Sequence, residues 1–257
     1  MQRHVRSCVL ILGLAALPAA AWADDDGSPC GGLPGYAALK SALIAAVQTE
    51  TSGLDFQMWG TIVNRDGVVC AVAFSGANRG SQWPGSRVIA AQKANTANAF
   101  GLDGLALSTA NLYSAVQPGG SLYGLQHSNP VDTDVAYGGS PSAYGTAHDP
   151  MVGRRIGGVN VFGGGLGLYN AQHKIVGAVG VSGDTSCADH MIAWRVRKIL
   201  GFDHLGTVVG GPASLFAGDS THPDNIIYDI DAAKPSGFGH PTCLNTANPL
   251  TLPPVSP

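Results

Sequence analysis

Residues 154–184 read RRIGGVNVFGGGLGLYNAQHKIVGAVGVSGD, and this stretch decides the fold. Its apolar and β-branched residues predict two or three strands around one hairpin, whose polar turn covers residues 170–173. Glycine at nearly every second position leaves one sheet face almost bare. Since glycine weakens a strand, it is usually kept where a backbone or ligand comes close. We therefore expect a ligand or a neighbouring subunit beside the glycines of residues 157–165, namely Gly157, Gly158, Gly163, Gly164 and Gly165.

The glycine cluster at residues 162–167 is similar in composition to a dinucleotide-binding fingerprint. That motif must open a helix. Here the chain enters another hairpin, and no helical pattern follows before Thr185. The context therefore argues against nucleotide binding.

The first 23 residues have the pattern of a cleavable secretory signal. Arg3 and Arg6 precede an apolar core at residues 9–17, and Ala21 and Ala23 supply a cleavage site. The apolar core is too short for a permanent anchor, so we expect no membrane span and a secreted or periplasmic protein. Residues 24–35 then form an N-terminal segment. The formal net charge of −3 and the lack of a basic patch argue against a nucleic-acid partner.

Four cysteines remain after cleavage, at positions 30, 70, 187 and 243. An even number in an oxidising compartment favours two disulfides over metal ligation. Of the three pairings, we favour Cys30 with Cys243, joining the irregular tails, and Cys70 with Cys187, joining the core. The alternative is a free Cys187 thiol made reactive by a helix N-terminus.

The order of the remaining patterns predicts an α+β fold with one antiparallel sheet covered by helices. Helical periodicity and caps predict four helices, and alternating apolar residues predict a hairpin. The helices are expected at residues 34–52, 86–100, 108–116 and 186–200, and the hairpin strands at residues 56–63 and 68–74. Beyond residue 202 we expect an irregular tail, 203–257, with an edge strand at residues 226–230.

Two polar regions supply candidate ligand-binding residues. In the helix at residues 86–100, Lys93 and Thr96 belong either to a solvated face or to a site that binds an acid group. Residues 117–154 show no period and form a long inserted loop, and loops of this length are often binding lids, partner arms or disordered insertions. This loop contributes Tyr123, His127 and His148 as candidate ligands.

Four segments together resemble the GlcG/HbpS-like family, also called the haem-degrading domain family. They are VNRDG at residues 63–67, KANTA at 93–97, GGV at 157–159 and VGAVGVSG at 176–183, and they occur in the family's order. The resemblance covers residues 36–202. It implies a profilin-like fold and a homodimer or larger ring. Some members bind haem or a corrinoid, and haem degradation is proposed for part of the family.

The resemblance and the residues together leave three functions open. The first is an exported protein that binds haem or a related tetrapyrrole without covalent attachment, since no Cys-x-x-Cys-His motif is present. Its axial donor would be His127, His190 or Tyr123, with His127 or His190 as the metal ligand.

The second function is an enzyme of haem degradation or small-metabolite turnover, in which Asp184 or His190 moves protons. The sequence shows no nucleophile–base–orienter set, so a non-enzymatic protein is favoured. The third is a self-assembling accessory protein without a ligand, in which the glycine-rich sheet packs against its own copy.

Overall fold

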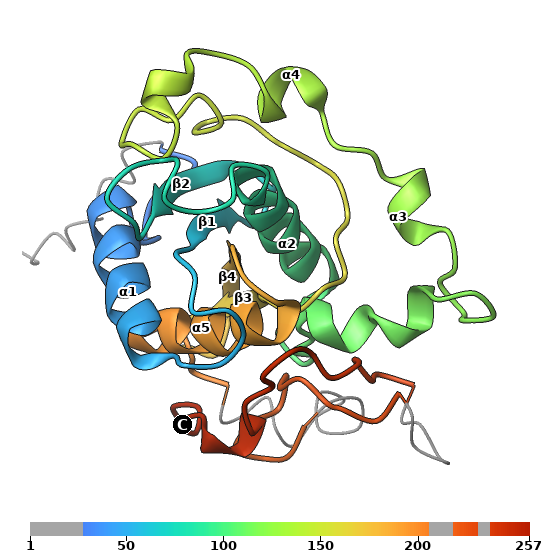
Figure 1. Ribbon diagram of the computed structural model, residues 1–257. Helices are drawn as coiled ribbons and strands as arrows, with labels where there is room; N and C mark the ends of the chain where they lie inside the picture. Colours follow the sequence, from blue (N-terminus) through green and yellow to red (C-terminus); the bar gives the residue numbers. More distant parts are fainter. Residues whose placement is uncertain (1–27, 206–217, 231–236) are drawn as a thin grey trace, which may run out of the picture.

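The computed structural model describes residues 28–205, 218–230 and 237–257, so the expected signal at residues 1–23 lies outside the described residues (Figure 1). Seven longer elements form the body of the molecule. They are α1 (Tyr36–Thr49), β1 (Trp59–Asn64), β2 (Val69–Phe74), α2 (Ser86–Phe100), β3 (Gly165–Tyr169), β4 (Ile175–Ser182) and α5 (Ser186–Ile199). No helix in the described parts of the chain is long and apolar enough to cross a membrane.

The four strands form one antiparallel sheet in the order β2-β1-β4-β3. The central strands β1 and β4 pair along their whole shared length, from Trp59 opposite Ser182 to Asn64 opposite Gly177. Every residue of β1 is buried, as expected for a strand covered on both faces. The predicted α+β class with one antiparallel sheet covered by helices is confirmed.

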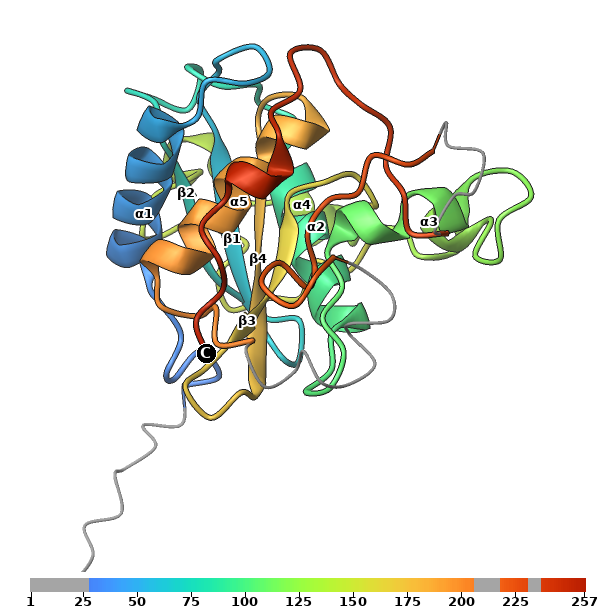
Figure 2. The ribbon, with the colours of Figure 1, turned by 90° about the horizontal axis from the view of Figure 1, so that it is seen from below.

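Helices cover both faces of this sheet (Figures 1 and 2). On one face α1 and α5 form a core with the strands, including Leu39, Leu43 and Met191. On the other face α2 packs with the strands and with the segment at residues 131–156, including Val135 and Met151. The sheet therefore separates two apolar cores, and the insertion packs against both α2 and the strands.

The helix α2 approaches the sheet very closely at Gly180 of β4. A Cβ atom at Gly180 would collide with the carbonyl oxygen of Ala90 and the amide nitrogen of Ala94. The alanines favour helix formation, and their small side chains are fully buried at this contact. Small residues on both elements thus set the distance between helix and sheet.

Three glycines of residues 154–184 pack directly against backbone carbonyls of other elements of the same chain. A side chain at Gly163 would strike the Ser186 carbonyl, one at Gly164 the Val181 carbonyl, and one at Gly165 the Lys93 carbonyl. The expectation of a close backbone approach is correct. We expected a ligand or a neighbouring subunit at these glycines, but the groups that approach them belong to α2, β4 and α5 of the same chain.

Some expected elements differ from those observed. Residues 108–116 form two short 3₁₀ helices, Thr109–Leu112 and Ser114–Val116, instead of an α-helix. A capping box between Ser108 and Asn111 favours this tight turn. Residues 226–230 form no strand, and regular pairing in the glycine-rich stretch begins only at Gly165. The insertion carries two single-turn helices, α3 (Leu125–Ser128) and α4 (Thr133–Ala136), and the 3₁₀ turn Pro141–Ala143.

Both expected disulfide pairings are wrong. Cys30 is bonded to Cys70, and Cys187 is bonded to Cys243, with Cα–Cα distances of 5.5 and 6.0 Å. The segment before α1 lies beside the β1–β2 hairpin, where the Asn64 side chain donates to the Pro29 carbonyl. The tail crosses the start of α5, so Cys243 meets Cys187. A free reactive thiol at Cys187 is likewise excluded in this state.

The described tail is part of the core on the α5 side. The buried guanidinium of Arg197 on α5 pairs with Asp224, at 2.6 Å, and both side chains are fully buried. The indole of Trp194 donates to the Pro253 carbonyl, and Leu252 joins the core of α1 and α5. A short 3₁₀ turn, Pro249–Thr251, precedes this contact.

We expect Gly180→Val to destabilise the fold, because the added side chain forces α2 away from β4. Overpacking a core typically costs about 1–3 kcal/mol. Chemical denaturation followed by circular dichroism measures the change. The matched control is Gly104→Val, since a Cβ at exposed Gly104 meets no atom within 4 Å. Equal stability of the two variants would contradict the close helix–sheet contact.

We expect Asp224→Ala to lower the free energy of unfolding by about 3–5 kcal/mol, because it leaves the buried Arg197 charge without its partner. Lys174→Ala is the control, since it removes an ion pair with Asp103 whose side chains are 62% and 51% exposed. Such exposed pairs contribute about 1 kcal/mol or less. A loss in Asp224→Ala no larger than in the control would show that the tail does not stabilise the domain.

Candidate functional site

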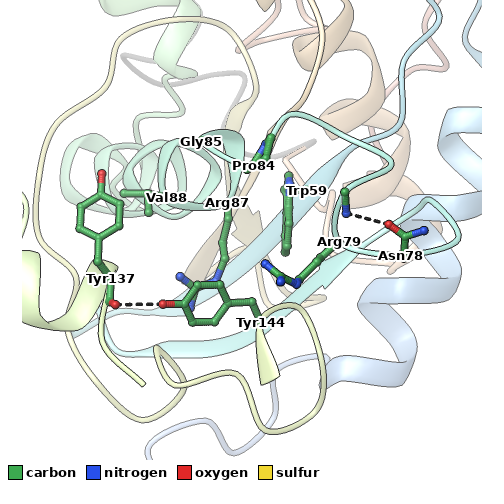
Figure 3. A pocket seen from close by; sticks show the side chains of 10 residues that line it. Trp59, Asn78, Arg79, Pro84, Gly85, Arg87, Val88, Tyr137 and Tyr144 are labelled. Atoms are coloured by element: carbon green, nitrogen blue, oxygen red, sulfur yellow. Dashed lines mark hydrogen bonds between the residues drawn. The ribbon is translucent and has the colours of Figure 1, made fainter. Parts of the chain in front are cut away.

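The larger of two cavities beside α2, which we call the aromatic cleft, has a volume of about 550 Å³ (Figure 3). It lies between the start of α2, the first strand and the insertion. Its lining residues are Trp59, Asn78, Arg79, Gly80, Pro84, Gly85, Arg87, Val88, Tyr137 and Tyr144. Volumes of about 300–1,000 Å³ are typical of small-molecule sites.

Trp59 forms the base of the aromatic cleft and is held on two sides. Its indole nitrogen donates to the Trp83 carbonyl at 3.0 Å, and its ring meets Phe74 edge-on at 5.3 Å. The insertion approaches the same rings at Gly145, which has a φ of +71°. A side chain at Gly145 would collide with Phe74 and Trp59, so glycine allows the insertion to close over the strands.

Arg87 of α2 anchors the insertion from inside the protein. Its Nε donates to Asp149 at 2.9 Å, a second nitrogen bonds the same carboxylate, and a third reaches the Ala136 carbonyl at 2.8 Å. The guanidinium carbon lies 3.6 Å from the ring centroid of Tyr144. Because Asp149 also accepts from the amides of Gly145 and Met151, one buried ion pair orders the insertion around the cleft.

Two polar side chains of the aromatic cleft stay open to solvent. Arg79 is exposed and has no ion pair with any described residue, and Tyr137 is 64% exposed. The Tyr144 hydroxyl, in contrast, donates to the Tyr137 carbonyl at 2.9 Å (Figure 3). The cleft therefore offers flat aromatic walls, one available cation and one available phenol.

A second cavity, which we call the α5 cavity, lies on another face of α2 and has a volume of about 280 Å³. It shares no lining residue with the aromatic cleft. Its lining residues are Trp83, Ser86, Ile89, Lys93, Phe162, Ser182, Asp184, Ser186 and Asp189.

A buried ion pair forms the floor of the α5 cavity. The ammonium group of Lys93 lies 2.6 Å from the Asp189 carboxylate and 3.3 Å from the Val181 carbonyl. Burial raises the pKa of Asp189 to about 6, and the Lys93 charge opposes this rise. The other carboxylate oxygen accepts from the amides of Gly183 and Asp184. Lys93 is therefore buried rather than on a solvated face, and its charge is already paired.

The structure gives several other candidate residues structural roles. Thr96 is fully buried, donates to the Gln92 carbonyl and accepts from the Asn160 amide. The Asp184 carboxylate accepts from the amides of Leu54 and Phe56, so it anchors that loop. Gly157 and Gly158 both have positive φ and lie outside both cavities. These contacts explain the residue types without a ligand.

The expected iron ligands are not brought together. Tyr123 is 62% exposed and His127 is exposed, and both lie in the insertion outside the two cavities, as does exposed His148. His190 is fully buried, where its Nε2 lies 3.2 Å from Asn225 and 3.1 Å from the Ile226 amide. The structure thus places His190 in the core beneath the tail, where its Nε2 is occupied and no part of the ring is exposed to solvent.

The sequence did not predict that four of the cleft residues lie together, namely Trp59, Arg79, Arg87 and Tyr137. The only signal was the aromatic content of the insertion, which includes Tyr137 and Tyr144.

One group of potential metal-ligating atoms lies elsewhere, within 4.8 Å of one another, in Cys187, His240 and Cys243. Because the two sulfurs are joined in a disulfide, this group has no thiolate to offer a metal.

We expect His190 to make folding stability dependent on pH. Burial lowers its pKa to about 3, against 6.5 ordinarily. The unfolded chain therefore binds a proton that the folded protein excludes, so this contribution is present above pH 6.5 and is lost as pH falls toward 3. His190→Gln should flatten the plot of unfolding free energy against pH in this window by up to about 1.4 kcal/mol per pH unit. Denaturant titrations across the window measure it, and parallel plots would contradict the buried neutral state.

Comparison with known proteins gives a family match. The model of the family described as "Haem degrading protein HbpS-like" matches residues 37–197, more than half of the chain. No curated protein matches the sequence at a significant level.

Three solved structures are similar to this one. Protein ORFY of Klebsiella pneumoniae is 24% identical with a TM-score of 0.42, over 65% of this chain and 90% of that chain. A PduOC:heme complex is 23% identical with a TM-score of 0.43, over 63% and 89%. A double mutant of HbpS from Streptomyces reticuli is 19% identical with a TM-score of 0.41, over 73% and 99%.

Proposed function

The chain belongs to the HbpS-like family, and we propose that its aromatic cleft binds haem or a related tetrapyrrole without covalent attachment. The observation that carries this proposal is the composition of the cleft. It combines a volume of about 550 Å³ with flat aromatic side chains and an arginine that no described residue neutralises. Family membership supports the class of ligand, and the shape and lining of the cleft support it as the binding site.

The cleft residues fit the apolar ring and the acid groups of such a ligand. Tyr137 and Tyr144 offer aromatic surface over the nearly buried ring of Trp59, and aromatic pairs favour offset-stacked or edge-to-face contact. Arg79 can bind a carboxylate through two parallel hydrogen bonds, which a lysine cannot do. Arg87 contributes less to ligand binding, because Asp149 already holds its guanidinium.

An iron atom in this cleft would find an oxygen donor. The lining residues include no histidine, cysteine or methionine, and Tyr137 carries the exposed phenol. Tyrosine is an established axial ligand of haem iron, alongside histidine and cysteine. Bound haem would supply redox chemistry, and Tyr137 is the residue of the cleft that would hold its iron. This assignment replaces the candidates Tyr123, His127 and His190.

The insertion closes one side of the cleft. It contributes Tyr137 and Tyr144, and its fold depends on the Arg87–Asp149 pair and on Gly145. We therefore assign residues 117–154 the role of a fixed cover over the ligand.

The proposal includes export to the medium or the periplasm. Two disulfides support it, since such bonds persist in oxidising compartments. N-terminal sequencing of the protein from its native compartment measures whether residues 1–23 are removed. The homo-oligomer that the family resemblance implies stays a prediction, which light scattering of the purified protein measures.

Haemin titration tests the proposed ligand. The wild-type protein should give a Soret band that saturates at one haemin per chain and should quench tryptophan fluorescence through Trp59. Tyr137→Phe should shift the band and weaken binding, because it removes the phenolate donor while keeping the ring. Tyr123→Phe is the matched control, since Tyr123 is equally exposed but lies outside the cleft, and it should titrate as wild type.

A second variant distinguishes the role of the Arg79 cation from that of the proposed iron ligand, Tyr137. Arg79→Ala should weaken haemin binding without moving the Soret maximum, because it removes a partner of the acid groups and leaves the iron ligand in place. Haemin binding that is absent in the wild type, or unaffected by both Tyr137→Phe and Arg79→Ala, would overturn the proposal.

A further inference from the structure

We propose that Ser186 and His240 form a nucleophile–base pair that opens into the α5 cavity and cleaves small carboxylic esters by acyl transfer. The Ser186 hydroxyl oxygen lies 3.2 Å from His240 Nε2. Ser186 is partly exposed and lines the cavity, whereas His240 is buried behind it. A hydroxyl within hydrogen-bond reach of an imidazole that a third group orients is the arrangement of an activated serine.

The hydrogen bonds of His240 fix which nitrogen carries the proton. Its Nδ1 lies 2.7 Å from the Pro241 carbonyl oxygen, and a carbonyl can only accept. Nδ1 therefore carries the hydrogen and Nε2 has the free lone pair. Within this pair the Ser186 hydroxyl is the donor and Nε2 the acceptor, which is the direction needed to activate the oxygen; the disulfide sulfur of Cys243, at 3.6 Å, is a weaker second acceptor. The Pro241 carbonyl takes the place that a carboxylate holds in other serine triads.

Three contacts hold His240 in this position. Its amide donates to the Ile227 carbonyl at 2.7 Å, and its ring lies 4.9 Å from that of Tyr113. Three residues further on, Cys243 is bonded to Cys187, the neighbour of Ser186. The disulfide thus fastens the histidine segment to the helix that carries the serine, although 54 residues separate the two.

Burial also sets the protonation state of the base. It lowers the pKa of His240 to about 4, and the charge of Lys93 acts in the same direction, while the bond to Pro241 opposes it. At neutral pH the ring is therefore in its neutral, proton-accepting form. A base this weak gives slow turnover, since general bases work best with a pKa near the operating pH. Covalent labelling is accordingly a more sensitive readout than turnover.

The surroundings of Ser186 suit a small ester with an apolar acyl group. Trp83 and Phe162 line the cavity and are 49% and 44% exposed, so they form an open apolar mouth. Ser186 is the first residue of α5, where backbone amides have no carbonyl partner within the helix. No described residue accepts a hydrogen bond from the Ser186 amide. This amide and the helix dipole can stabilise an oxyanion that forms at the serine.

The reaction proceeds in two balanced halves. The Ser186 oxygen adds to the ester carbonyl while its proton passes to His240 Nε2, and the tetrahedral adduct then expels the alcohol, which takes that proton. Water next adds to the acyl-serine with His240 as base, and the carboxylic acid leaves as the serine hydroxyl is restored. One ester and one water give one acid and one alcohol, with no oxidant or metal required.

Labelling of the full-length protein with a fluorophosphonate, followed by intact-mass and peptide mass spectrometry, tests the pair. The wild-type protein should gain one phosphonate, located on Ser186. His240→Gln should slow labelling by roughly 100- to 10,000-fold, the usual effect of losing a general base. Ser186→Ala should abolish it. Ser128→Ala removes an exposed serine of α3 and should label as wild type.

The same variants separate this proposal from the first one. The two cavities share no lining residue, so Ser186→Ala should keep wild-type haemin titration and circular dichroism. Ester turnover with p-nitrophenyl acetate and p-nitrophenyl butyrate should follow the labelling rates across the variants. A wild-type protein that takes up no phosphonate, or that is labelled equally after Ser186→Ala, would overturn the assignment whatever the haemin result.

Discussion

The contact between α2 and β4 at Gly180 is the constraint on which the other features depend. Because Gly180 has no side chain, the backbone of α2 lies directly on the sheet at Ala90 and Ala94. This depth brings Lys93 within reach of Asp189 on α5, at the floor of the α5 cavity. Another face of the helix meets the insertion at the aromatic cleft. A helix held farther from the sheet would disrupt the ion pair and both cavities.

Three buried ion pairs then hold the parts of the chain together, and two of them connect the insertion and the tail to the body. Lys93–Asp189 joins α2 to α5, Arg87–Asp149 joins α2 to the insertion, and Arg197–Asp224 joins α5 to the tail. Buried pairs of this kind add little net stability compared with apolar residues, because desolvation opposes the attraction of the charges. They instead disfavour alternative arrangements of the chain, since any arrangement that separates the partners leaves an unpaired charge in the core. The insertion and the tail, which pair with no strand of the sheet over a regular ladder, are thereby held in one position.

The sequence predicted the parts of the fold that depend on local patterns. The ranges of α2 and α5 followed from periodicity, and the β1–β2 hairpin followed from alternating residues around a turn. Contacts between segments that are far apart in the sequence produce no local pattern, so they could not be predicted in this way. The cysteine count was informative but the pairing was not, because pairing depends on how the terminal segments cross the body. Ser186 and His240 meet only in three dimensions, and the glycines indicated a close approach without indicating what approaches.

The burial of Arg197 has a consequence for how such a chain can evolve. Its guanidinium lies in the core, where its counter-ion, Asp224, comes from the tail. A relative that ends soon after α5 would leave this charge facing solvent or core without a counter-ion, so selection should replace the arginine there. An arginine at the position of Arg197 together with an aspartate in a C-terminal extension would then be inherited as a unit. Their joint presence would mark the relatives that carry such an extension.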